Sequence, residues 1–579
     1  MTRNAEIADL FEEYANLLEA QDVQYKPQSY RRAADNIREY PEDIEALAAD
    51  GSEAVEQIPQ VGDSIAGKVV EYFETGEIDA LEEERANLPV RIGELTRVEG
   101  VGPKTVGTLY DELGVQTLDD LEEVARAGEI REIKGFGPKT EKNIIDGIEF
   151  ARTVRGRELL GNARPVGEQV RTFVSDVPSV GRCELAGSIR RWCETIGDVD
   201  VLAESEDKQA VIDAFTDWER AAEVIEAGTD KAAIRVSDMR IDLRVVVPEE
   251  FGSALQYFTG SKNHNITLRN HAIERDLKVN EYGVFDVSDV DDPDAGQRIG
   301  EKIASETEES MYEALGLPLI APEMREDNGE IDAALAGELP DLIEEGDIRG
   351  DLHLHTNWSD GNNTIEEMVE GAIEFGHDYI SISDHATGPG MVGGVGLDDD
   401  ELREQIGEIR TVADDAVIDV FAGVEANIDA DGGISVPNDV LAELDIVVAS
   451  PHSGLDGDET ERLVRAIEHP SVDILGHPSG RLINQRPGLD FDVREVATAA
   501  VDNDVALEIN SNPSRLDLWG AAVQVAVEEG ATIAINTDAH SPGEYRNVRY
   551  GVHTARRGWA EAVDVLNAWE AAEVRDFVH

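Results

Sequence analysis

Apolar residues follow two different spacings along this chain, and the spacing changes near residue 155. Before that point they recur at helical spacing, as in MTRNAEIADLFEEYANLL at the start, which predicts helices. After it, short runs such as GDVDVL and MRIDLRVVV alternate apolar and polar residues, which predicts strands. From Gly350 onward, seven strand-like runs are separated by helical stretches. We therefore expect a multidomain chain that is helical first, then α+β, then (β/α).

Three of the helical segments repeat one pattern of a short helix, a turn with glycine and a second helix. They are IPQVGDSIAGKVVEYF from Ile58, LTRVEGVGPKTVGTLY from Leu95 and IREIKGFGPKTEKNII from Ile130. Glycine lets backbone N–H groups approach an anion, at a helix N-terminus where the dipole favours negative charge. A helix-hairpin-helix module binds a DNA phosphate in this way without reading a base. A single hairpin could be a turn in a helical bundle, but three in succession favour DNA binding. The predicted phosphate-binding glycines are Gly62, Gly100, Gly102, Gly135 and Gly137.

A cluster of aspartates marks the α+β part. Asp198 and Asp200 are two residues apart in GDVDVL, so both side chains lie on one face of a strand, and Asp242 follows in MRIDLRVVV. Like-charged carboxylates side by side are unfavourable unless a cation lies between them. Three aspartates on two neighbouring strands can hold two Mg²⁺ (or Mn²⁺) ions about 4 Å apart, which activate a 3′-hydroxyl and stabilise a departing pyrophosphate.

Groups suited to a triphosphate precede the aspartates. Gly187 and Ser188 offer backbone amides and a hydroxyl, and Arg190 and Arg191 offer guanidinium groups. Acidic residues on a solvated edge strand are the alternative for the aspartates, but the order of these motifs favours a nucleotide site.

These motifs resemble those of a known family. GSIRR, GDVDVL, RIDLR and YFTGSKNHN are similar to motifs of the family X DNA polymerases, the nucleotidyltransferases of base-excision and gap repair, over residues 1–322. The resemblance implies that Asp198, Asp200 and Asp242 are catalytic metal ligands. It also implies Ser188, Arg191 and Gly197 near the triphosphate, Tyr257, Phe258 and Gly260 along the sugar and base, and Asn265 and Arg269 on the minor-groove side. Gly187 and Arg240 are further predicted nucleotide-binding residues.

In the N-terminal domain, the resemblance implies that Lys26 and Tyr30 bind a 5′-phosphate and that Lys68 is the Schiff-base lysine of a lyase. Ser64 stands where lyase members of the family carry a basic residue, which argues against this activity. A solvated helix lysine is the alternative for Lys68.

The first strand of the C-terminal part carries histidines on one face. In GDLHLH, Asp351, His353 and His355 alternate with leucines, so the polar side chains share a face. Six further strand-like runs end in SDH, GVEA, SPH, GHP, EIN and TDAH. The C-terminal ends of parallel strands are where (β/α) barrels build active sites. Imidazole and carboxylate together suit Zn²⁺, Mn²⁺ or Fe²⁺, and several such ions activate water and neutralise a phosphoryl transition state. The pattern therefore predicts a multinuclear phosphoester hydrolase.

This part resembles the PHP (polymerase and histidinol phosphatase) domain, a trinuclear metal phosphoesterase, over about residues 350–541. The residues at the family's nine ligand positions are His353, His355, Asp360, His385, Glu425, His452, His477, Asp538 and His540. Because no position has lost its ligand, we expect an active centre with up to three transition-metal ions (Mn²⁺, Zn²⁺ or Fe²⁺). Glu508 and Asn510 lie outside this set of ligands. We expect the remaining histidines to be ordinary core or surface residues; they are His377, His469, His553 and His579.

The order of the parts resembles the bacterial and archaeal PolX enzymes. It implies a gap-filling repair polymerase that uses dNTPs, with a 3′-5′ exonuclease, and an abasic-site endonuclease or 3′-phosphatase, in the PHP domain. A PHP phosphoesterase whose upstream half only delivers DNA is the competing hypothesis. The expected parts are a lyase-like helix-hairpin-helix domain (1–90), fingers with two hairpins (91–155), a nucleotidyltransferase palm (156–250), a thumb (251–321), an acidic, partly helical linker (322–348) and a (β/α)7-like PHP barrel (349–579).

Composition adds an expected environment. The chain has 50 basic and 123 acidic residues, a net charge of −73, and no lysine after Lys302. Such a protein repels polyanions in dilute salt, but at roughly 1 M salt the Debye length is about 3 Å, so distant surface charge barely affects a ligand in a site. We predict the cytoplasm of an extreme halophile.

From the remaining features we expect neither export nor insertion into a membrane. Cys183 and Cys193 form neither a disulfide framework nor a metal-ligand pattern. Apolar runs are too short to span a bilayer, and the N-terminus lacks the basic start and cleavage site of a signal peptide. We expect a monomer that acts on gapped or primer-template DNA, away from membranes.

Overall fold

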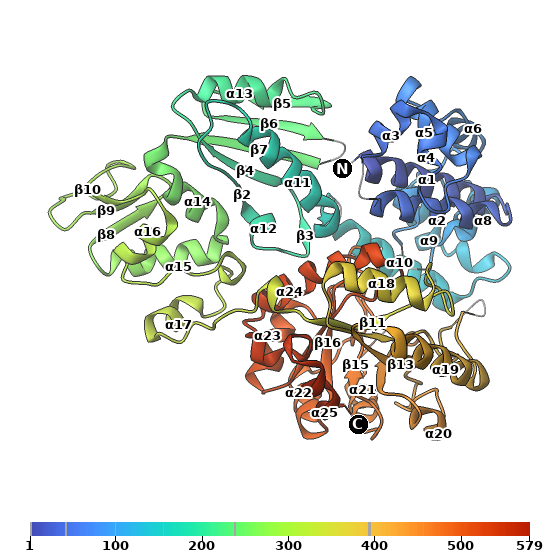
Figure 1. Cartoon of the computed structure of the whole chain (residues 1–579). Coiled ribbons are helices and arrows are strands. Elements are labelled where there is room, and N and C mark those ends of the chain that lie inside the picture. Colours follow the sequence, from blue (N-terminus) through green and yellow to red (C-terminus); the bar gives the residue numbers. More distant parts are fainter. Residues whose placement is uncertain are drawn as a thin grey trace. The chain divides into compact units, whose positions relative to one another are not determined.

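The computed structural model describes residues 3–40, 43–98, 100–153, 156–236, 239–391, 395–455 and 457–578 (Figure 1). The chain divides into two compact units, one of Met1–Arg157 with Leu482–Pro487 and one of Glu158–Arg481 with Gly488–His579. Among the residues described, no helix is both long and apolar enough to cross a membrane.

The described residues of the first unit form helices around one apolar core. These are α1 (Arg3–Ala20), α2 (Lys26–Glu39), α3 (Ile44–Asp50), α4 (Ser52–Val55), α5 (Asp63–Thr75), α6 (Asp79–Asn87), α7 (Ile92–Leu95), α8 (Pro103–Leu113), α9 (Leu118–Ala127), the 3₁₀ helix η1 (Ile130–Glu132) and α10 (Pro138–Thr153). Side chains at helical spacing, such as Ile7, Phe11 and Leu18 of α1, are buried in that core. The predicted helical character of this part is confirmed.

Each of the three hairpins forms, with two differences from the expected pattern. Their second helices are α5, α8 and α10, but the third hairpin opens with the single turn of η1 instead of an α-helix. The turn requires a residue at positive φ, which is Gly100 (78°) in the second hairpin, Gly135 (102°) in the third and Gln60 (61°) in the first. Gly62 and Gly102 then occupy the N-cap positions of α5 and α8. The glycine pattern thus marks helix starts in the hairpins more consistently than it marks the turn itself.

A five-stranded mixed sheet lies in the part predicted to be the palm, in the order β2-β4-β7-β6-β5 (Figure 1). Its strands are β2 (Cys183–Ala186), β4 (Val199–Glu204), β5 (Glu223–Ala227), β6 (Lys231–Val236) and β7 (Met239–Val246), with helices α11 (Leu160–Ser175), α12 (Gly187–Arg190) and α13 (Lys208–Thr216) and a small sheet of β1 (Glu158–Leu159) and β3 (Thr195–Ile196). β4 and β7 are parallel, and Asp200 stands opposite Asp242. Paired residues point to the same face of a sheet, so the two carboxylates are neighbours.

The thumb follows with helices and a three-stranded antiparallel sheet. Its elements are η2 (Pro248–Glu250), α14 (Phe251–Thr259), α15 (Lys262–Ile273), β8 (Leu277–Asn280), β9 (Gly283–Asp286), β10 (Glu301–Ala304) and α16 (Glu308–Ala314). Residues 322–348 then contain η3 (Pro322–Met324), α17 (Glu330–Ala336) and η4 (Glu345–Asp347). This segment is partly helical, as expected, but Arg325 is fully buried and Glu330 is 1% exposed, so its first half packs against the thumb instead of linking loosely.

The C-terminal part is a barrel of seven parallel strands in sequence order, from β11 to β17. The strands are β11 (Gly350–Leu354), β12 (Tyr379–Ile382), β13 (Asp419–Asn427), β14 (Ile446–Ser450), β15 (Ile474–Leu475), β16 (Ala506–Asn510) and β17 (Ile533–Asn536). The helices are α18 (Ile365–Phe375), α19 (Asp399–Asp415), α20 (Asn438–Leu441), α21 (Thr460–Ile467), α22 (Val493–Asp502), α23 (Gly520–Glu528), α24 (Val548–Arg557) and α25 (Ala571–Phe577), with η5 (Pro542–Asn547), η6 (Ala562–Asp564) and η7 (Leu566–Ala568). A bridge between Leu354 and Ala539 joins the first strand to the segment after the last, which confirms the predicted seven-stranded barrel.

Candidate active sites

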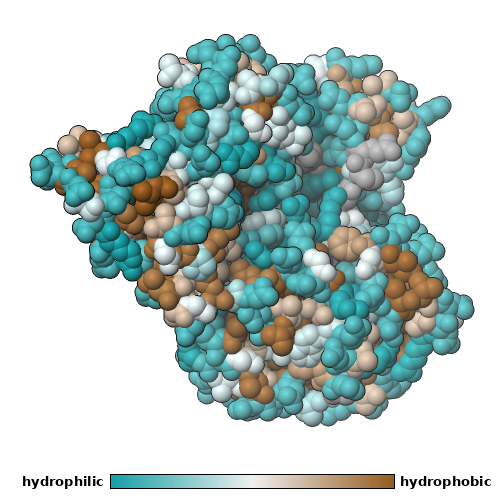
Figure 2. Space-filling view, turned by 60° about the vertical axis from the view of Figure 1, so that its left-hand side comes forward, coloured by the Kyte–Doolittle hydropathy of each residue, from teal (hydrophilic) through white to brown (hydrophobic). Residues whose placement is uncertain are grey.

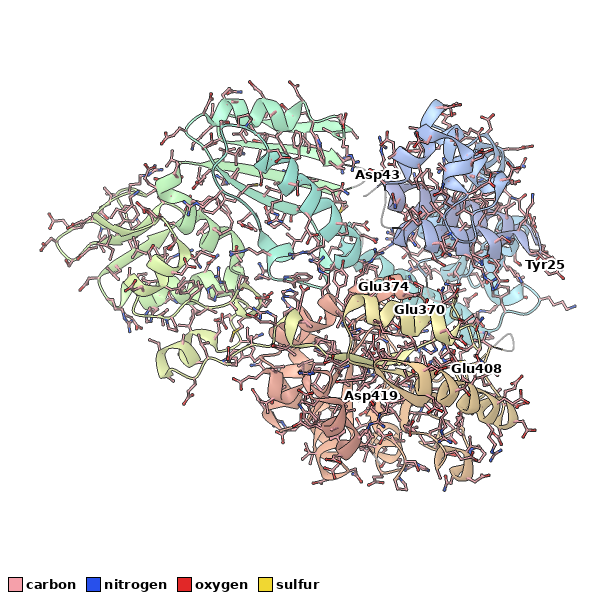
Figure 3. The ribbon with its side chains drawn as sticks, in the orientation of Figure 1. Tyr25, Asp43, Glu370, Glu374, Glu408 and Asp419 are labelled. Carbon is pink, nitrogen blue, oxygen red and sulfur yellow. The ribbon has the colours of Figure 1, made fainter. Side chains whose placement is uncertain are left out.

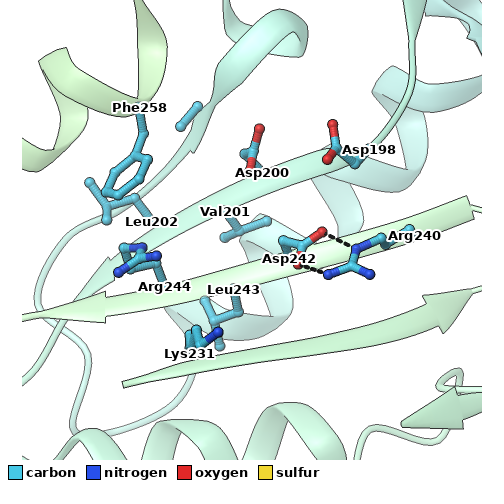
Figure 4. A pocket seen from close by; sticks show the side chains of 11 residues that line it. Asp198, Asp200, Val201, Leu202, Lys231, Arg240, Asp242, Leu243, Arg244 and Phe258 are labelled. Atoms are coloured by element: carbon cyan, nitrogen blue, oxygen red, sulfur yellow. Dashed lines mark hydrogen bonds and ion pairs between the residues drawn. The ribbon is translucent and has the colours of Figure 1, made fainter. Parts of the chain in front are cut away.

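Three carboxylates line one pocket of the palm (Figure 4). Asp198 directly precedes β4, Asp200 lies within it, and Asp242 lies beside them on β7. The pocket has a volume of about 290 Å³. Its other lining residues are Ala186, Val201, Leu202, Lys231, Arg240, Leu243, Arg244 and Phe258. The structure therefore brings the three aspartates together, and their role as metal ligands stays a prediction from the sequence.

The pocket holds three carboxylates and three cationic side chains, Lys231, Arg240 and Arg244, and its carboxylates crowd one another. Burial, together with the charges of Asp198 and Asp242, raises the pKa of Asp200 to about 7. Arg240 donates two hydrogen bonds to Asp242, to Oδ2 at 2.6 Å and to Oδ1 at 2.7 Å. At Gly187, which has φ of +62°, an added Cβ would lie 2.1 Å from Asp200 Oδ2, so only glycine fits there. A crowded carboxylate whose ionisation is this unfavourable suits a site that binds divalent cations.

The two arginines of α12 and its C-cap have partners of their own. Arg190 Nη2 lies 2.7 Å from Glu308 Oε2. Arg191 Nε lies 2.9 Å from Glu326 Oε1, and Arg191 Nη1 donates to the carbonyl oxygen of Thr259 at 2.7 Å. Both guanidinium groups are therefore oriented by the thumb and by the segment that follows it.

The predicted sugar and base residues lie at the end of α14. The rings of Tyr257 and Phe258 meet edge to face with centroids 5.2 Å apart, and the Arg244 guanidinium lies 4.6 Å from the Phe258 centroid. Asn265 Nδ2 donates to the carbonyl oxygens of Tyr257 at 2.8 Å and Gly260 at 3.1 Å, so it fixes the turn between α14 and α15. Of the other predicted nucleotide-binding residues, Ser188 is half-buried on α12, and Gly197 and Arg269 are exposed.

In the first unit, the predicted lyase residue Lys68 lies beside Tyr30. Lys68 Nζ donates to Ser64 at the carbonyl oxygen (3.1 Å) and at Oγ (3.3 Å), and lies 5.8 Å from the centroid of the Tyr30 ring. Tyr30 is buried, and Lys26 is exposed at the first position of α2. Ser64 thus gives Lys68 a hydroxyl partner where the family's lyases have a cation.

The strand ends of the barrel bring the PHP ligands into one cluster. Three groups of ligand atoms, each within 4.8 Å of one another, could hold a metal ion: His355, Asp360, His385 and His540; His353, His355 and Glu425; and His385, Glu425 and His452. The remaining two predicted ligands adjoin them, since His477 Nε2 lies 3.0 Å from Glu425 Oε1 and Asp538 Oδ1 lies 3.0 Å from His355 Nε2.

Several atoms of the cluster are buried without a hydrogen-bond partner among the described residues. They are His353 Nε2, His355 Nδ1 and His477 Nδ1. His355 Nε2 and His385 Nδ1 instead lie against carboxylates, of Asp538 at 3.0 Å and of Glu425 at 2.5 Å. Each buried polar atom without a hydrogen bond costs on the order of 1–3 kcal/mol of stability. Burial also opposes the imidazolium of His385, yet the adjacent Glu425 and Asp360 raise its pKa to about 10. Atoms that lack partners and carboxylates that attract positive charge fit a site for divalent cations.

A second layer of side chains orients the histidines, and sequence reasoning missed most of it. Glu508 Oε1 lies 2.8 Å from His353 Nδ1, and its Oε2 accepts from the backbone N–H of His477 at 2.7 Å. Asn427 Oδ1 lies 2.8 Å from His452 Nδ1. Carboxylate and amide partners of this kind fix the tautomer of a ligating histidine. The available signal for Asn427 was its position two residues after Glu425, on the same face of β13.

Two aspartates of the strand-end pattern hold the scaffold of the cluster. Asp384 accepts from the backbone N–H of Thr356 at 2.7 Å and from Ser359 Oγ at 2.5 Å, in the loop that carries Asp360. Asp351 accepts from the backbone N–H of Thr537, and burial raises its pKa to about 6.

Of the histidines expected to be ordinary, His377 is buried and His469 is half-buried. His553 stacks on Trp192 of the palm with centroids 3.6 Å apart. His579 lies outside the described residues.

Family models match four parts of the chain. They are a helix-hairpin-helix domain over residues 2–78, a SAM-like helix-hairpin-helix tandem over 92–149, a DNA polymerase beta thumb over 254–326 and a PHP domain over 351–512.

Relatives match both the whole chain and its C-terminal part. The chain is 33% identical over 564 residues to the DNA polymerase/3′-5′ exonuclease PolX of Bacillus subtilis, covering 96% of each chain. A probable phosphatase of Caldanaerobacter subterraneus subsp. tengcongensis is 32% identical over 205 residues, 33% of this chain and 75% of the relative. A probable phosphatase of Thermoanaerobacter sp. is 32% identical over 206 residues, 33% of this chain and 78% of the relative. The chain therefore belongs to the PolX family, the family X DNA polymerases that carry a C-terminal PHP domain.

Proposed function

We propose that this protein is a DNA repair polymerase that adds dNTPs to a 3′-hydroxyl in gapped or primer-template DNA and trims 3′ ends with its PHP domain. The observation that carries this proposal is that one chain has two separate clusters of potential metal ligands. One consists of three aspartates in the palm and the other of histidines and carboxylates in the barrel.

In the palm, Asp198, Asp200 and Asp242 would hold two Mg²⁺ or Mn²⁺ ions. When bound, these ions supply positive charge to the attacking 3′-oxygen and the departing pyrophosphate. The chain itself orients the nucleotide: Phe258 offers a ring face to the sugar and base, and Arg191 a guanidinium to the triphosphate.

In the barrel, the nine predicted ligands would hold up to three Mn²⁺, Zn²⁺ or Fe²⁺ ions. Such ions supply a hydroxide nucleophile near neutral pH. Glu508 and Asn427 hold the histidine rings in place, and the hairpin helix starts in the first unit contribute backbone N–H groups for DNA phosphates.

Separation of the two activities tests the proposal. Gapped DNA with labelled ends is incubated with dNTPs and Mg²⁺ or Mn²⁺. We expect the double variant Asp198→Ala/Asp200→Ala to lose synthesis and keep 3′ trimming, and His353→Ala/His355→Ala to lose trimming and keep synthesis. If either pair left its assigned activity intact, that assignment would fail.

A phosphomonoesterase activity of the barrel is the second candidate, because relatives that match only this part are named probable phosphatases. Under this second candidate function, the polymerase-like half of the chain only delivers DNA to the barrel. A substrate with a 3′-phosphate, assayed with and without dNTPs, separates the two: release of phosphate by the wild type, with no synthesis even when dNTPs are present, favours the second candidate.

Lyase activity at Lys68 is a separate question, and the Ser64 contacts argue against it. We expect no borohydride-trapped adduct on an abasic substrate. An adduct that disappears in Lys68→Ala would overturn this expectation.

A further inference from the structure

Arg191, proposed above to bind the triphosphate, is paired with a carboxylate. Its Nε lies 2.9 Å from Glu326 Oε1, and the Arg191 side chain is only 13% exposed. A carboxylate this close, and partly shielded from solvent, neutralises much of the arginine's attraction for an anion. On its own, Glu326 would therefore weaken the proposed nucleotide site.

The same carboxylate is shared with a second arginine, which comes from helix α24 of the PHP barrel. Arg557 Nη1 lies 3.1 Å from Glu326 Oε1 and donates to the carbonyl oxygen of Arg191 at 2.7 Å. Arg557 also lies 3.4 Å from Cys193 Sγ, but burial raises the pKa of this thiol, so it stays neutral. Two guanidinium groups and one carboxylate leave this group a net charge of +1, and Arg191 is close enough to act on the charge of Asp200 in the aspartate pocket.

A second group of two arginines and one carboxylate is formed around the neighbouring residue, Arg190. Arg190 shares Glu308 with Arg325, which is fully buried. There, both the carboxylate and the second arginine lie within residues 254–326, the part that the thumb model matches. At Arg191, the carboxylate also lies within that part, but the second arginine comes from helix α24 of the PHP barrel. The chain thus forms two adjacent groups, each of two arginines that share one carboxylate. The PHP domain supplies the second arginine of the group at Arg191.

We propose that the PHP domain completes the nucleotide site of the polymerase, with Arg557 as a positioning residue that shares Glu326 and leaves the charge of Arg191 available to a triphosphate. This inference rests on the proposed function, namely that the palm adds nucleotides. Without Arg557, Glu326 pairs with Arg191 alone and the net charge of the group falls from +1 to zero. The palm would then bind dNTPs less well even though no residue of the palm had changed.

Steady-state incorporation of a dNTP into gapped DNA by the full-length chain tests the inference, with the 3′-5′ exonuclease rate and the melting temperature measured on the same preparations. Arg557→Gln should raise KM for the dNTP about tenfold, the usual effect of losing one charged interaction, with the exonuclease rate unchanged. Adding Glu326→Gln to Arg557→Gln should bring KM back toward the wild-type value, because no carboxylate then offsets the charge of Arg191. A purely structural role would not give this rescue.

Arg556→Gln is the matched control. Arg556 is the preceding residue of α24 and binds Glu323 and the carbonyl oxygen of Ile343, both at 2.8 Å, so its loss weakens docking of the same helix without touching Glu326. We expect it to leave KM unchanged. The inference is overturned if Arg557→Gln leaves KM unchanged, if Arg556→Gln raises KM equally, or if the double variant shows no rescue. A wild type that incorporates no dNTP would instead reject the proposed function.

Discussion

At the residue scale, buried charged groups decide how each centre responds to substitution. Glu508 is fully buried and contacts two predicted metal ligands, His353 and His477, although it is not a predicted ligand itself. Its carboxylate orients one imidazole through the ring nitrogen and the other through the backbone. The binding of metal in the barrel should therefore depend on a residue that does not touch the metal.

We expect Glu508→Gln to weaken metal binding in the barrel by about 10- to 100-fold. Titration with Mn²⁺, followed by exonuclease rate, should show activity that recovers at excess metal, while nucleotide addition is unchanged. Glu468→Gln, at an exposed position after α21, serves as the control. Equal metal affinities for the variant and the wild type would contradict the role given to Glu508.

Glu308 gives a pH-dependent prediction. Burial alone would raise the pKa of Glu308, but Arg325 and Arg190 lower it from 4.5 to about 2. Because the pKa is lower in the folded state, the resulting stability is present above about pH 4.5 and is lost as pH falls toward 2. This difference corresponds to a free energy of unfolding on the order of 3 kcal/mol.

Denaturant unfolding should show Glu308→Gln destabilised by about that amount at neutral pH, with the difference from wild type shrinking as the solution is acidified. Glu309→Gln changes the same charge at an exposed neighbouring position and should have little effect. A difference that persisted unchanged at low pH would show that the Glu308 carboxylate is not its source.

The candidate metal ligands and their clustering could be predicted, whereas the residues that support them largely could not. All nine predicted PHP ligands meet in one cluster, because each lies near or beyond the C-terminal end of a strand and the barrel gathers strand ends. Asn427 and the Glu326–Arg557 pair depend on contacts between distant segments, and no spacing along the chain encodes them. Spacing also gave no sign that Asp384 would hold a loop instead of facing the cluster.

At the scale of the element, each hairpin depends on one backbone conformation. Gly135 has φ of +102° and Gly100 has φ of +78°, in the region that side chains rarely adopt. Periodicity predicted these hairpins well, since helix spacing and glycine are local signals. It could not predict that the third begins with a 3₁₀ turn, or that Gln60 takes the positive φ in the first, because propensities at these positions are weak.

Substitution in the third hairpin tests its role in DNA binding. Gly135→Val should add about 1–3 kcal/mol of backbone strain and displace the N–H groups at the start of α10. We expect a dissociation constant for gapped DNA about tenfold higher at fixed salt, measured by fluorescence anisotropy.

Gly93→Ala is the control, because an added Cβ there meets no atom within 4 Å and its φ is not positive in the unfavourable range. Unchanged DNA affinity of Gly135→Val in a folded protein would show that this hairpin does not contact DNA.

At the scale of the whole molecule, charge sets the conditions under which the two centres can work. The net charge is −73, and exposed acidic side chains such as Glu370 and Glu374 lie along α18 (Figure 3). The face in Figure 2 is mostly hydrophilic, with scattered apolar patches. Such a surface repels itself and DNA unless salt screens it.

We expect the melting temperature and DNA affinity to fall when KCl is lowered from about 1 M to about 0.1 M, where the Debye length grows from about 3 Å to about 10 Å. Replacing KCl by an uncharged osmolyte at equal osmolarity should not restore them, which separates charge screening from solvent exclusion. Full stability and activity at low salt would contradict a halophilic origin.

The central claim is that one chain holds divalent cations in two independent places. Anomalous scattering from crystals grown with Mn²⁺ measures this directly. We predict peaks both at the aspartates of the palm and at the histidine cluster of the barrel. Peaks at only one of these places, or at neither, would contradict the claim.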